Sequence, residues 1–204
     1  MNIKSNIKYI FLLLVFVQCK EKKEDTLFKK INTPYTICLQ PFADIDSTIV
    51  MAIKDSIQKI YSLTKINANE PLPAFAFYKK NNRYKADSLL TFLNLLRNEN
   101  ELMVGLTNKD ISTTKDNIED WGVMGLGKCP GYTCVASTFR LKKENIKSQF
   151  FKVAIHELGH TQGLPHCENT TCYMRDAEGK NPTNEEIGFC IKCRTFLINK
   201  NWKL

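Results

Sequence analysis

The sequence predicts an α/β fold, in which a mixed, mostly parallel sheet packs on helices and a small irregular part follows at the C-terminus. Apolar runs of strand length alternate with segments whose apolar residues recur at helical spacing. After Gly163, cysteines and turn-forming residues replace both patterns. The 204 residues have room for one domain of ordinary size and little more.

Strands and helices are expected in alternation along the body of the chain. The expected strands are Tyr35–Phe42, Ala74–Tyr78, Glu101–Thr107, Trp121–Gly127 and Thr133–Leu141. The expected helices are Asp44–Ser62, Tyr84–Arg97 and Asn145–Gln162. Asp44 or Asp46 is available as the N-terminal cap of the first helix.

All three histidines fall within eleven residues, from His156 to His166. His156 and His160 are four residues apart, so a helix places both imidazoles on one face, where each can give a ring nitrogen to one metal ion. Gly163 can adopt the left-handed backbone that ends a helix, and Pro165 prevents the helix from resuming. The turn lets His166 return as a third ligand and leaves one corner of a tetrahedral Zn²⁺ open for water.

Glu157 follows the first histidine and points about a quarter turn away from it, toward the open corner. A carboxylate in this position can act as the general base toward a zinc-activated water. The pattern HExxHxxGxxH needs five fixed residues. Background composition makes its chance occurrence in such a chain roughly one in 10^5. Histidines of an amphipathic helix core are the alternative, but a catalytic zinc site is the stronger prediction.

The sequence continues as Cys167-x4-Cys172-x-Met174 and then Cys190-x2-Cys193. With the histidine motif, this spacing resembles the archaemetzincin family of the metzincin clan of zinc metallopeptidases. The resemblance covers most of residues 35–193. It implies a metzincin-like fold with an active-site helix, in which a cleft separates an N-terminal subdomain (residues 33–163) from a C-terminal one (residues 164–204).

Met174 has a structural role in this resemblance, which implies that it ends a tight turn and forms the apolar floor under the imidazoles. An ordinary core methionine is the alternative. Cys167, Cys172, Cys190 and Cys193 have a spacing suited to a closed tetrahedral site. The resemblance implies that they hold a structural zinc, which makes two Zn²⁺ per chain. Two disulfides are the competing interpretation, because cysteines outside the cytoplasm tend to oxidise.

The remaining cysteines of the body need no metal. Cys129 and Cys134 lie on either side of a four-residue Pro-Gly turn and could form a disulfide in an oxidising compartment, which the sequence alone does not decide. Cys38 lies in an expected strand and is better explained as a small buried apolar residue than as a reactive thiol.

The first eighteen residues resemble a bacterial signal peptide. Met1–Lys8 carries two lysines and no acid, and Tyr9–Val17 is an apolar run of nine residues, too short to span a bilayer. No Ala or Gly occurs among the first forty residues, and Gln18-Cys19 resembles the lipobox of lipoproteins. We expect a lipid on Cys19, a charged tether over residues 19–32, and anchoring in the bacterial cell envelope. An uncleaved anchor or a secreted protein are the alternatives.

The formal charge of +8 does not indicate nucleic-acid binding. Residues 1–30 hold seven Lys and three acidic residues, a net of +4, so half of the excess lies outside the body. The remainder is scattered, without a basic run that carries interleaved aromatic residues.

Zinc-dependent hydrolysis of peptide bonds in a peptide or protein is the function that these features favour, carried out by a monomer. A zinc-stabilised surface module that binds peptides with little or no turnover is the alternative, and the complete set of ligands and base counts against it. Hydrolysis of a non-peptide amide would use the same site. Trp121–Gly127 is the expected edge strand for an extended substrate, because its three glycines let another backbone approach; they equally suit a weak, bulged edge.

Overall fold

The structure, a computed structural model, describes residues 34–42 and 45–204. The expected signal peptide (residues 1–18), the lipidation site Cys19 and the tether (residues 19–32) lie outside these residues. The part of the chain from Asn32 to Leu204 forms one compact unit. Among the described residues, every helix is too short or too polar to cross a membrane.

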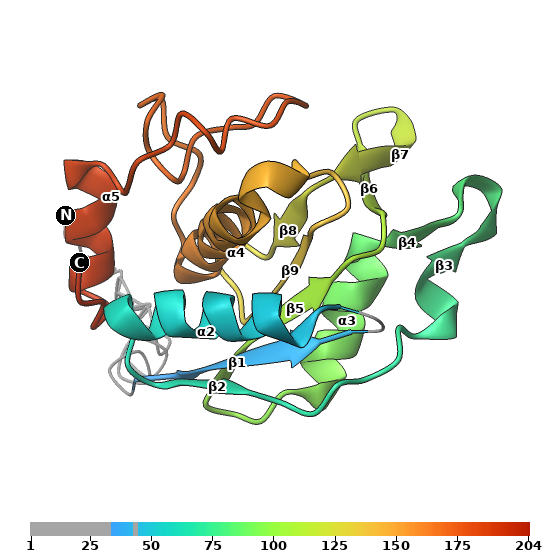
Figure 1. Ribbon diagram of the computed structural model, residues 1–204, viewed down its shortest axis with the longest axis horizontal. Helices are drawn as coiled ribbons and strands as arrows, with labels where there is room; N and C mark the ends of the chain where they lie inside the picture. The colour runs from blue at the N-terminus through green and yellow to red at the C-terminus, as the bar shows by residue number, and fades with distance from the viewer. Residues whose placement is uncertain (1–33, 43–44) are drawn as a thin grey trace, which may run out of the picture. The chain divides into compact units, whose positions relative to one another are not determined.

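A five-stranded sheet with the order β2-β1-β5-β9-β8 lies at the centre of the fold (Figure 1). Its strands are β1 (Thr36–Pro41), β2 (Thr64–Ile66), β5 (Glu101–Thr107), β8 (Gly125–Gly127) and β9 (Thr133–Ser137). Neighbouring strands are parallel, except that β8 runs antiparallel to β9 at the edge. The expected mixed, mostly parallel sheet is confirmed.

Helices cover both faces of this sheet, and alternate residues of each strand point to opposite faces. Leu39 and Val104 belong to the apolar cluster that includes α2 (Ser47–Ile60) and α4 (Ile146–Gln162). The preceding residues, Cys38 and Met103, belong to the cluster formed with α3 (Ala86–Leu96) on the other face. Burial on both faces explains why the central strands are continuous apolar runs.

The ends of α2 and α4 follow from individual residues. Asp46 caps α2, since its Oδ1 accepts a hydrogen bond of 2.7 Å from the Thr48 N–H. Asp44, the other expected cap, lies outside the described residues. At the end of α4, Gly163 has a φ of 100° and its N–H donates to the His160 carbonyl. This left-handed residue turns the chain back toward the helix that carries the histidines.

A second sheet, with the order β3-β4-β6-β7, was not expected. Its strands are β3 (Phe77–Tyr78), β4 (Arg83–Lys85), β6 (Ile111–Lys115) and β7 (Ile118–Val123). The prediction of one strand over Trp121–Gly127 is wrong, because the segment contributes β7 to this sheet and β8 to the first. The expected helix Tyr84–Arg97 begins only at Ala86, because Tyr84 and Lys85 pair with β6.

Three further expectations are corrected. The expected strand Ala74–Tyr78 begins as a 3₁₀ turn, and only its last two residues form β3. The strand expected over Thr133–Leu141 ends at Ser137, where a turn closes with a bond from the Leu141 N–H to the Thr138 carbonyl. The C-terminal part also contains a helix, α5 (Ile191–Ile198), which the sequence did not reveal because its apolar residues do not fall on one face.

Candidate metal centres and active-site cleft

α4 brings the first two expected zinc ligands together. The Nε2 atoms of His156 and His160 lie 3.0 Å apart. The Nδ1 atom of His156 lies 2.6 Å from the Tyr173 carbonyl, and that of His160 lies 2.8 Å from the Leu164 carbonyl. A carbonyl only accepts hydrogen bonds, so Nδ1 carries the proton in each ring and Nε2 presents its lone pair to the cleft.

His166 reaches the same point from the segment that follows the turn at Gly163. Its ring centroid lies 5.4 Å from that of His156 and 4.9 Å from that of His160. One ring nitrogen from each of the three imidazoles lies within 4.8 Å of the others. The Nδ1 atom of His166 lies 3.3 Å from Asp176 Oδ2. Sequence reasoning missed Asp176, because nothing in the local pattern separates it from the other acidic residues of this segment.

The chemistry of this donor set fits zinc. Burial lowers the pKa of His156 to about 3, and burial is also the main reason why the pKa of His160 is lowered. Both rings are therefore neutral at physiological pH, which is the form that binds a metal ion. Three imidazole nitrogens that converge from two segments, two of them with tautomers fixed by carbonyls, match a tetrahedral zinc site with one open position.

Glu157 is buried against the edge strand β8, with 7% of its surface exposed. A β-carbon added at Gly125 would lie 2.5 Å from Glu157 Oε1, and one added at Gly127 would lie 2.7 Å from the Glu157 carbonyl oxygen. These two glycines therefore make room for the chain's own glutamate, whereas the sequence had suggested the approach of another backbone. Burial raises the pKa of Glu157 to about 8, and a zinc ion between the histidines would lower this pKa again, because a nearby cation favours the charged carboxylate.

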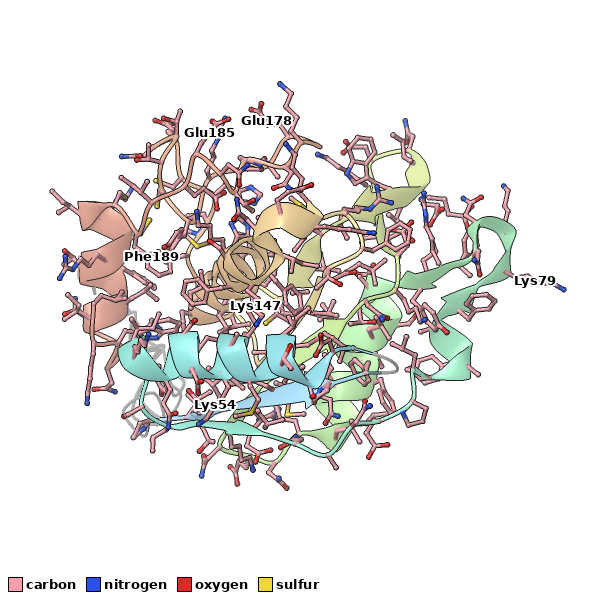
Figure 2. The ribbon with its side chains drawn as sticks, in the orientation of Figure 1. Lys54, Lys79, Lys147, Glu178, Glu185 and Phe189 are labelled. Atoms are coloured by element: carbon pink, nitrogen blue, oxygen red, sulfur yellow. The ribbon has the colours of Figure 1, made fainter. Side chains whose placement is uncertain are left out.

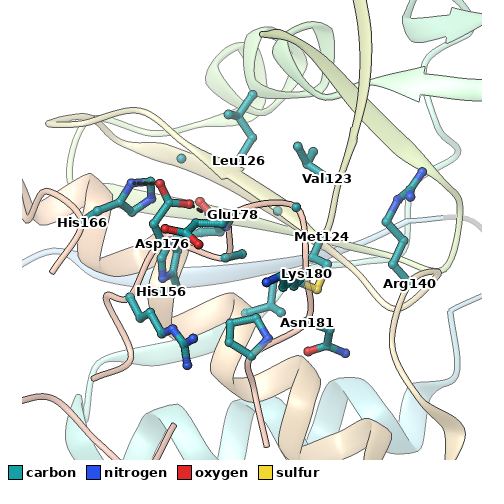
Figure 3. A pocket seen from close by; sticks show the side chains of 18 of the residues that line it. Val123, Met124, Leu126, Arg140, His156, His166, Asp176, Glu178, Lys180 and Asn181 are labelled. Carbon is teal, nitrogen blue, oxygen red and sulfur yellow. Dashed lines mark hydrogen bonds and ion pairs between the residues drawn. The ribbon is translucent and has the colours of Figure 1, made fainter. Parts of the chain in front are cut away.

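A cleft of about 660 Å³ is lined by Glu157 and the three histidines. Figure 3 shows this cleft, with His156 and His166 labelled. Residues of the second sheet, of β8, of α4 and of the segment 175–183 line this cleft. Figure 2 shows Glu178 on this last segment, away from the sheet. The segment is fastened to α4 because Lys152 Nζ donates to the carbonyls of Thr183 and Glu186, at 2.6 and 2.7 Å.

Comparison with known proteins agrees with this geometry. The model of peptidase family M54 matches residues 39–199. The chain belongs to peptidase family M54. The archaemetzincin of Methanopyrus kandleri is 30% identical over 167 residues, which cover 77% of this chain and 90% of that protein. The protein is therefore a zinc metallopeptidase similar to archaemetzincins, and its substrate class is peptide, as the sequence predicted.

Solved structures share the fold. The crystal structure of the Methanopyrus kandleri archaemetzincin matches with a TM-score of 0.71 and 28% identity, over 82% of this chain and 96% of that one. The archaemetzincin of Archaeoglobus fulgidus, complexed with malonate, matches with a TM-score of 0.69 and 25% identity, over 79% and 99% of the two chains. The metzincin-like fold class expected from the sequence is confirmed.

The M54 chain has a second cluster of metal-binding groups in its C-terminal part. The Sγ atoms of Cys167, Cys172, Cys190 and Cys193 lie within 4.8 Å of one another, and all four thiols are free. The Sγ atoms of Cys167 and Cys190 are 3.7 Å apart, well beyond the roughly 2.05 Å of a disulfide. Burial acts to raise the pKa of Cys190, but hydrogen bonds from the Cys193 N–H and neighbouring thiols lower it to about 7. This geometry fits one tetrahedral metal ion better than two disulfides.

Cys129 and Cys134, whose pairing the sequence left open, do not form a disulfide, since both thiols are free. Strands β8 and β9 pair so that Cys134 lies opposite Gly127. Cys129 comes two residues after Gly127 in the chain, so it does not lie opposite Cys134. Cys134 is fully buried, whereas Cys129 is exposed and donates to the Leu164 carbonyl at 3.4 Å. Cys38 is fully buried, as expected.

Met174 lies in a turn that begins after the first cysteine pair and is fully buried. A β-carbon added at Gly159 would overlap the Met174 sulfur, so the methionine packs on α4 at the residue before His160. The floor under the imidazoles that the resemblance implied for Met174 stays a prediction. The backbone of the turn also contributes to the site, because the Tyr173 carbonyl holds His156. That contribution could not be inferred from side-chain types.

Proposed function

We propose that the protein hydrolyses peptide bonds at a zinc ion held by His156, His160 and His166. The observation that carries this proposal is the convergence of three imidazole nitrogens, within 4.8 Å of one another, in a cleft that Glu157 also lines. Zinc, when bound at such a site, lowers the pKa of its water ligand to about 7 and polarises the scissile carbonyl.

Glu157 is the general base in this proposal. Its carboxylate accepts the proton of the attacking water and then passes it to the leaving nitrogen. Its close packing against Gly125 and Gly127 restricts it to one position, which supports such a role. The edge of β8 supports the binding of an extended peptide, because β9 is the one strand that pairs with β8 within residues 34–42 and 45–204.

A second, structural zinc is part of the proposal. The thiolates of Cys167, Cys172, Cys190 and Cys193 would hold it. The Cys172 Sγ accepts N–H groups from Met174 at 3.5 Å and from Cys190 at 3.3 Å, which stabilises a thiolate charge. The proposed content is two Zn²⁺ per chain, one catalytic and one structural.

Glu157→Gln tests the catalytic assignment. The variant should keep its zinc content and fold and lose at least about 10^2-fold of its peptidase rate, because a neutral amide cannot accept the proton. Glu144→Gln is the matched control, since Glu144 is exposed on the turn before α4 and does not line the cleft. Equal rates for the two variants would refute the role of Glu157.

The same assay separates the peptidase from a binding module. Wild-type protein that binds peptides of a broad library with both metal sites filled, yet cleaves none of them, would establish a zinc-stabilised peptide-binding protein. A complete set of three ligands and a buried carboxylate favours turnover.

For the N-terminus we keep the sequence-based proposal of a lipid anchor on Cys19 that holds the protein in the bacterial cell envelope. Cys19→Ser should move the protein from the membrane fraction to the soluble fraction, and an unchanged distribution would refute the anchor.

We also propose that the protein is a monomer. Sedimentation of a form without the first thirty-two residues would test this proposal.

A further inference from the structure

Arg140 lines the cleft but takes no part in the chemistry described above. It lies in the turn between β9 and α4, and its side chain is 33% exposed. In Figure 3 its guanidinium stands at the side of the pocket opposite His166, beyond Val123 and Met124. A cation on the side of the pocket opposite His166 can act on a part of the substrate other than the reacting peptide bond.

The guanidinium of Arg140 is held in one place. Its Nη2 atom lies 2.8 Å from Asp110 Oδ1 and 2.9 Å from Asp110 Oδ2. It also covers the backbone of Gly122 in β7, where an added β-carbon would overlap it. A guanidinium carries five N–H donors, so an ion pair through one nitrogen leaves donors for a ligand. The group is thus ordered in advance of binding, which lowers the entropy cost of recognition.

The surroundings of Arg140 leave a positive charge uncompensated. Asp110 also pairs with Arg83, whose Nε lies 2.7 Å from Oδ2. Asp120 pairs with Arg83 at 3.1 Å and with Lys85 at 3.6 Å. This network contains three cations and two carboxylates, a net charge of +1. The side chains of both carboxylates are largely buried. Among the three cations, Arg140 has the most exposed side chain, and it is the one that lines the cleft, so it presents the excess positive charge there.

We propose that Arg140 binds a carboxylate of the peptide substrate, so that the enzyme selects peptides with an acidic group beside Gly122. The inference rests on the proposed function and adds a substrate class to it. Gly122 in β7 and Gly125, the β8 position over Glu157, are three residues apart on either side of the bend at Met124, so the carboxylate would belong to a part of the substrate beside the scissile bond. An Asp or Glu side chain, or the C-terminal carboxylate of a short peptide, would form the charge-assisted pair.

Peptide binding tests the proposal without relying on turnover. Zinc-loaded Glu157→Gln protein is titrated with fluorescent peptides that differ only by a Glu or Gln at successive positions, and by a free or amidated C-terminus. One acidic position should bind about tenfold more tightly than its neutral counterpart, as expected for a charge-assisted hydrogen bond. Preference for a side chain or for the free C-terminus identifies which carboxylate is bound.

Four variants assign the preference to Arg140. Arg140→Gln should abolish it and Arg140→Lys should retain part of it. Lys147→Gln, which makes the same change of charge at an exposed position of α4 outside the cleft (Figure 2), should leave it intact. Gly122→Ala keeps the charge and pushes the guanidinium aside, so it should also weaken the preference. If Arg140→Gln fails to fold because it lacks the ion pair with Asp110, Gly122→Ala provides the test in its place.

Equal binding of acidic and neutral peptides by the Glu157→Gln protein would overturn the proposal. So would a preference that survives in both Arg140→Gln and Gly122→Ala. An acidic preference that depends on Arg140, in a protein whose wild-type form cleaves no peptide, would support this inference and refute the proposed hydrolysis. The two proposals can therefore fail separately.

Discussion

At the scale of single residues, the three histidines differ in what holds them. His156 and His160 contact backbone carbonyls, whereas His166, whose side chain is 48% exposed, faces the Asp176 carboxylate. A carboxylate partner orients an imidazole and makes it a better ligand. We predict that Asp176→Asn lowers the affinity for the catalytic zinc by about 10- to 100-fold, measured by competition with a chromophoric chelator. Glu178→Gln on the same segment is the control, and an equal loss there would contradict the prediction.

Gly159 provides a second test at this scale. Its missing β-carbon leaves the space that the Met174 sulfur fills. Gly159→Ala should therefore lower the free energy of unfolding by about 1–3 kcal/mol, because the methionine must move within a close-packed core. Urea unfolding measures the effect. Gly188→Ala is the control, since an added β-carbon there meets nothing within 4 Å and should change stability by less than about 0.5 kcal/mol.

At the scale of elements, an ion pair joins two strands of the central sheet. Glu101, at the start of β5, accepts a bond of 2.6 Å from Lys65 in β2 and further bonds from Asn98. Burial acts to raise the pKa of Glu101, but these bonds outweigh it and lower the pKa to about 2 from 4.5. The folded-state pKa lies below the unfolded one, so the stabilisation is present above pH 4.5 and is lost as the pH falls toward 2.

Glu101→Gln tests this dependence. The variant should be less stable than wild type at pH 7, and its stability should fall less between pH 4.5 and pH 2, because it no longer takes up the proton. Urea unfolding at several pH values measures both effects. Parallel profiles for the two proteins would show that the pair does not stabilise the folded state.

The elements also show what sequence patterns can reveal. β1, β5 and α4 were predicted closely because continuous burial and helical periodicity leave a strong local signal. The hairpin of β6 and β7 was missed because its residues are largely polar and half exposed, so it is held by pairing between strands that a local pattern does not record. The split of Trp121–Gly127 between two sheets has the same origin.

At the scale of the whole molecule, the cysteine cluster joins the turn after His166 to α5. Residues of α5 and beyond complete the main core, since Leu197 is fully buried and Trp202 packs on Tyr61 with ring centroids 5.4 Å apart. Loss of the metal from the cysteines should therefore loosen the C-terminal part. The effect on the catalytic histidines should be indirect.

Cys190→Ser tests this division of roles. We predict about one zinc per chain in place of two, and a melting temperature lower by on the order of 10 °C, while peptidase activity at low temperature largely persists. Metal analysis and calorimetry measure both. An unchanged melting temperature together with complete loss of activity would show instead that the cysteines serve the chemistry.

The site as a whole was only partly accessible from the sequence. The histidines, Glu157, Met174 and the four cysteines lie close together in the chain, in a spacing that zinc chemistry requires. Asp176, Arg140 and the carbonyl of Tyr173 reach the site only when separate segments meet in the fold. Such contacts depend on tertiary structure and leave no local spacing to detect.

A zinc-edge anomalous difference map, from crystals of protein purified without chelator, tests most directly whether the three imidazoles share one metal ion. We predict a peak about 2.0–2.1 Å from one ring nitrogen each of His156, His160 and His166, and another among the four Sγ atoms at about 2.3 Å. A map with the peak at the cysteines and none between the imidazoles would contradict the catalytic site.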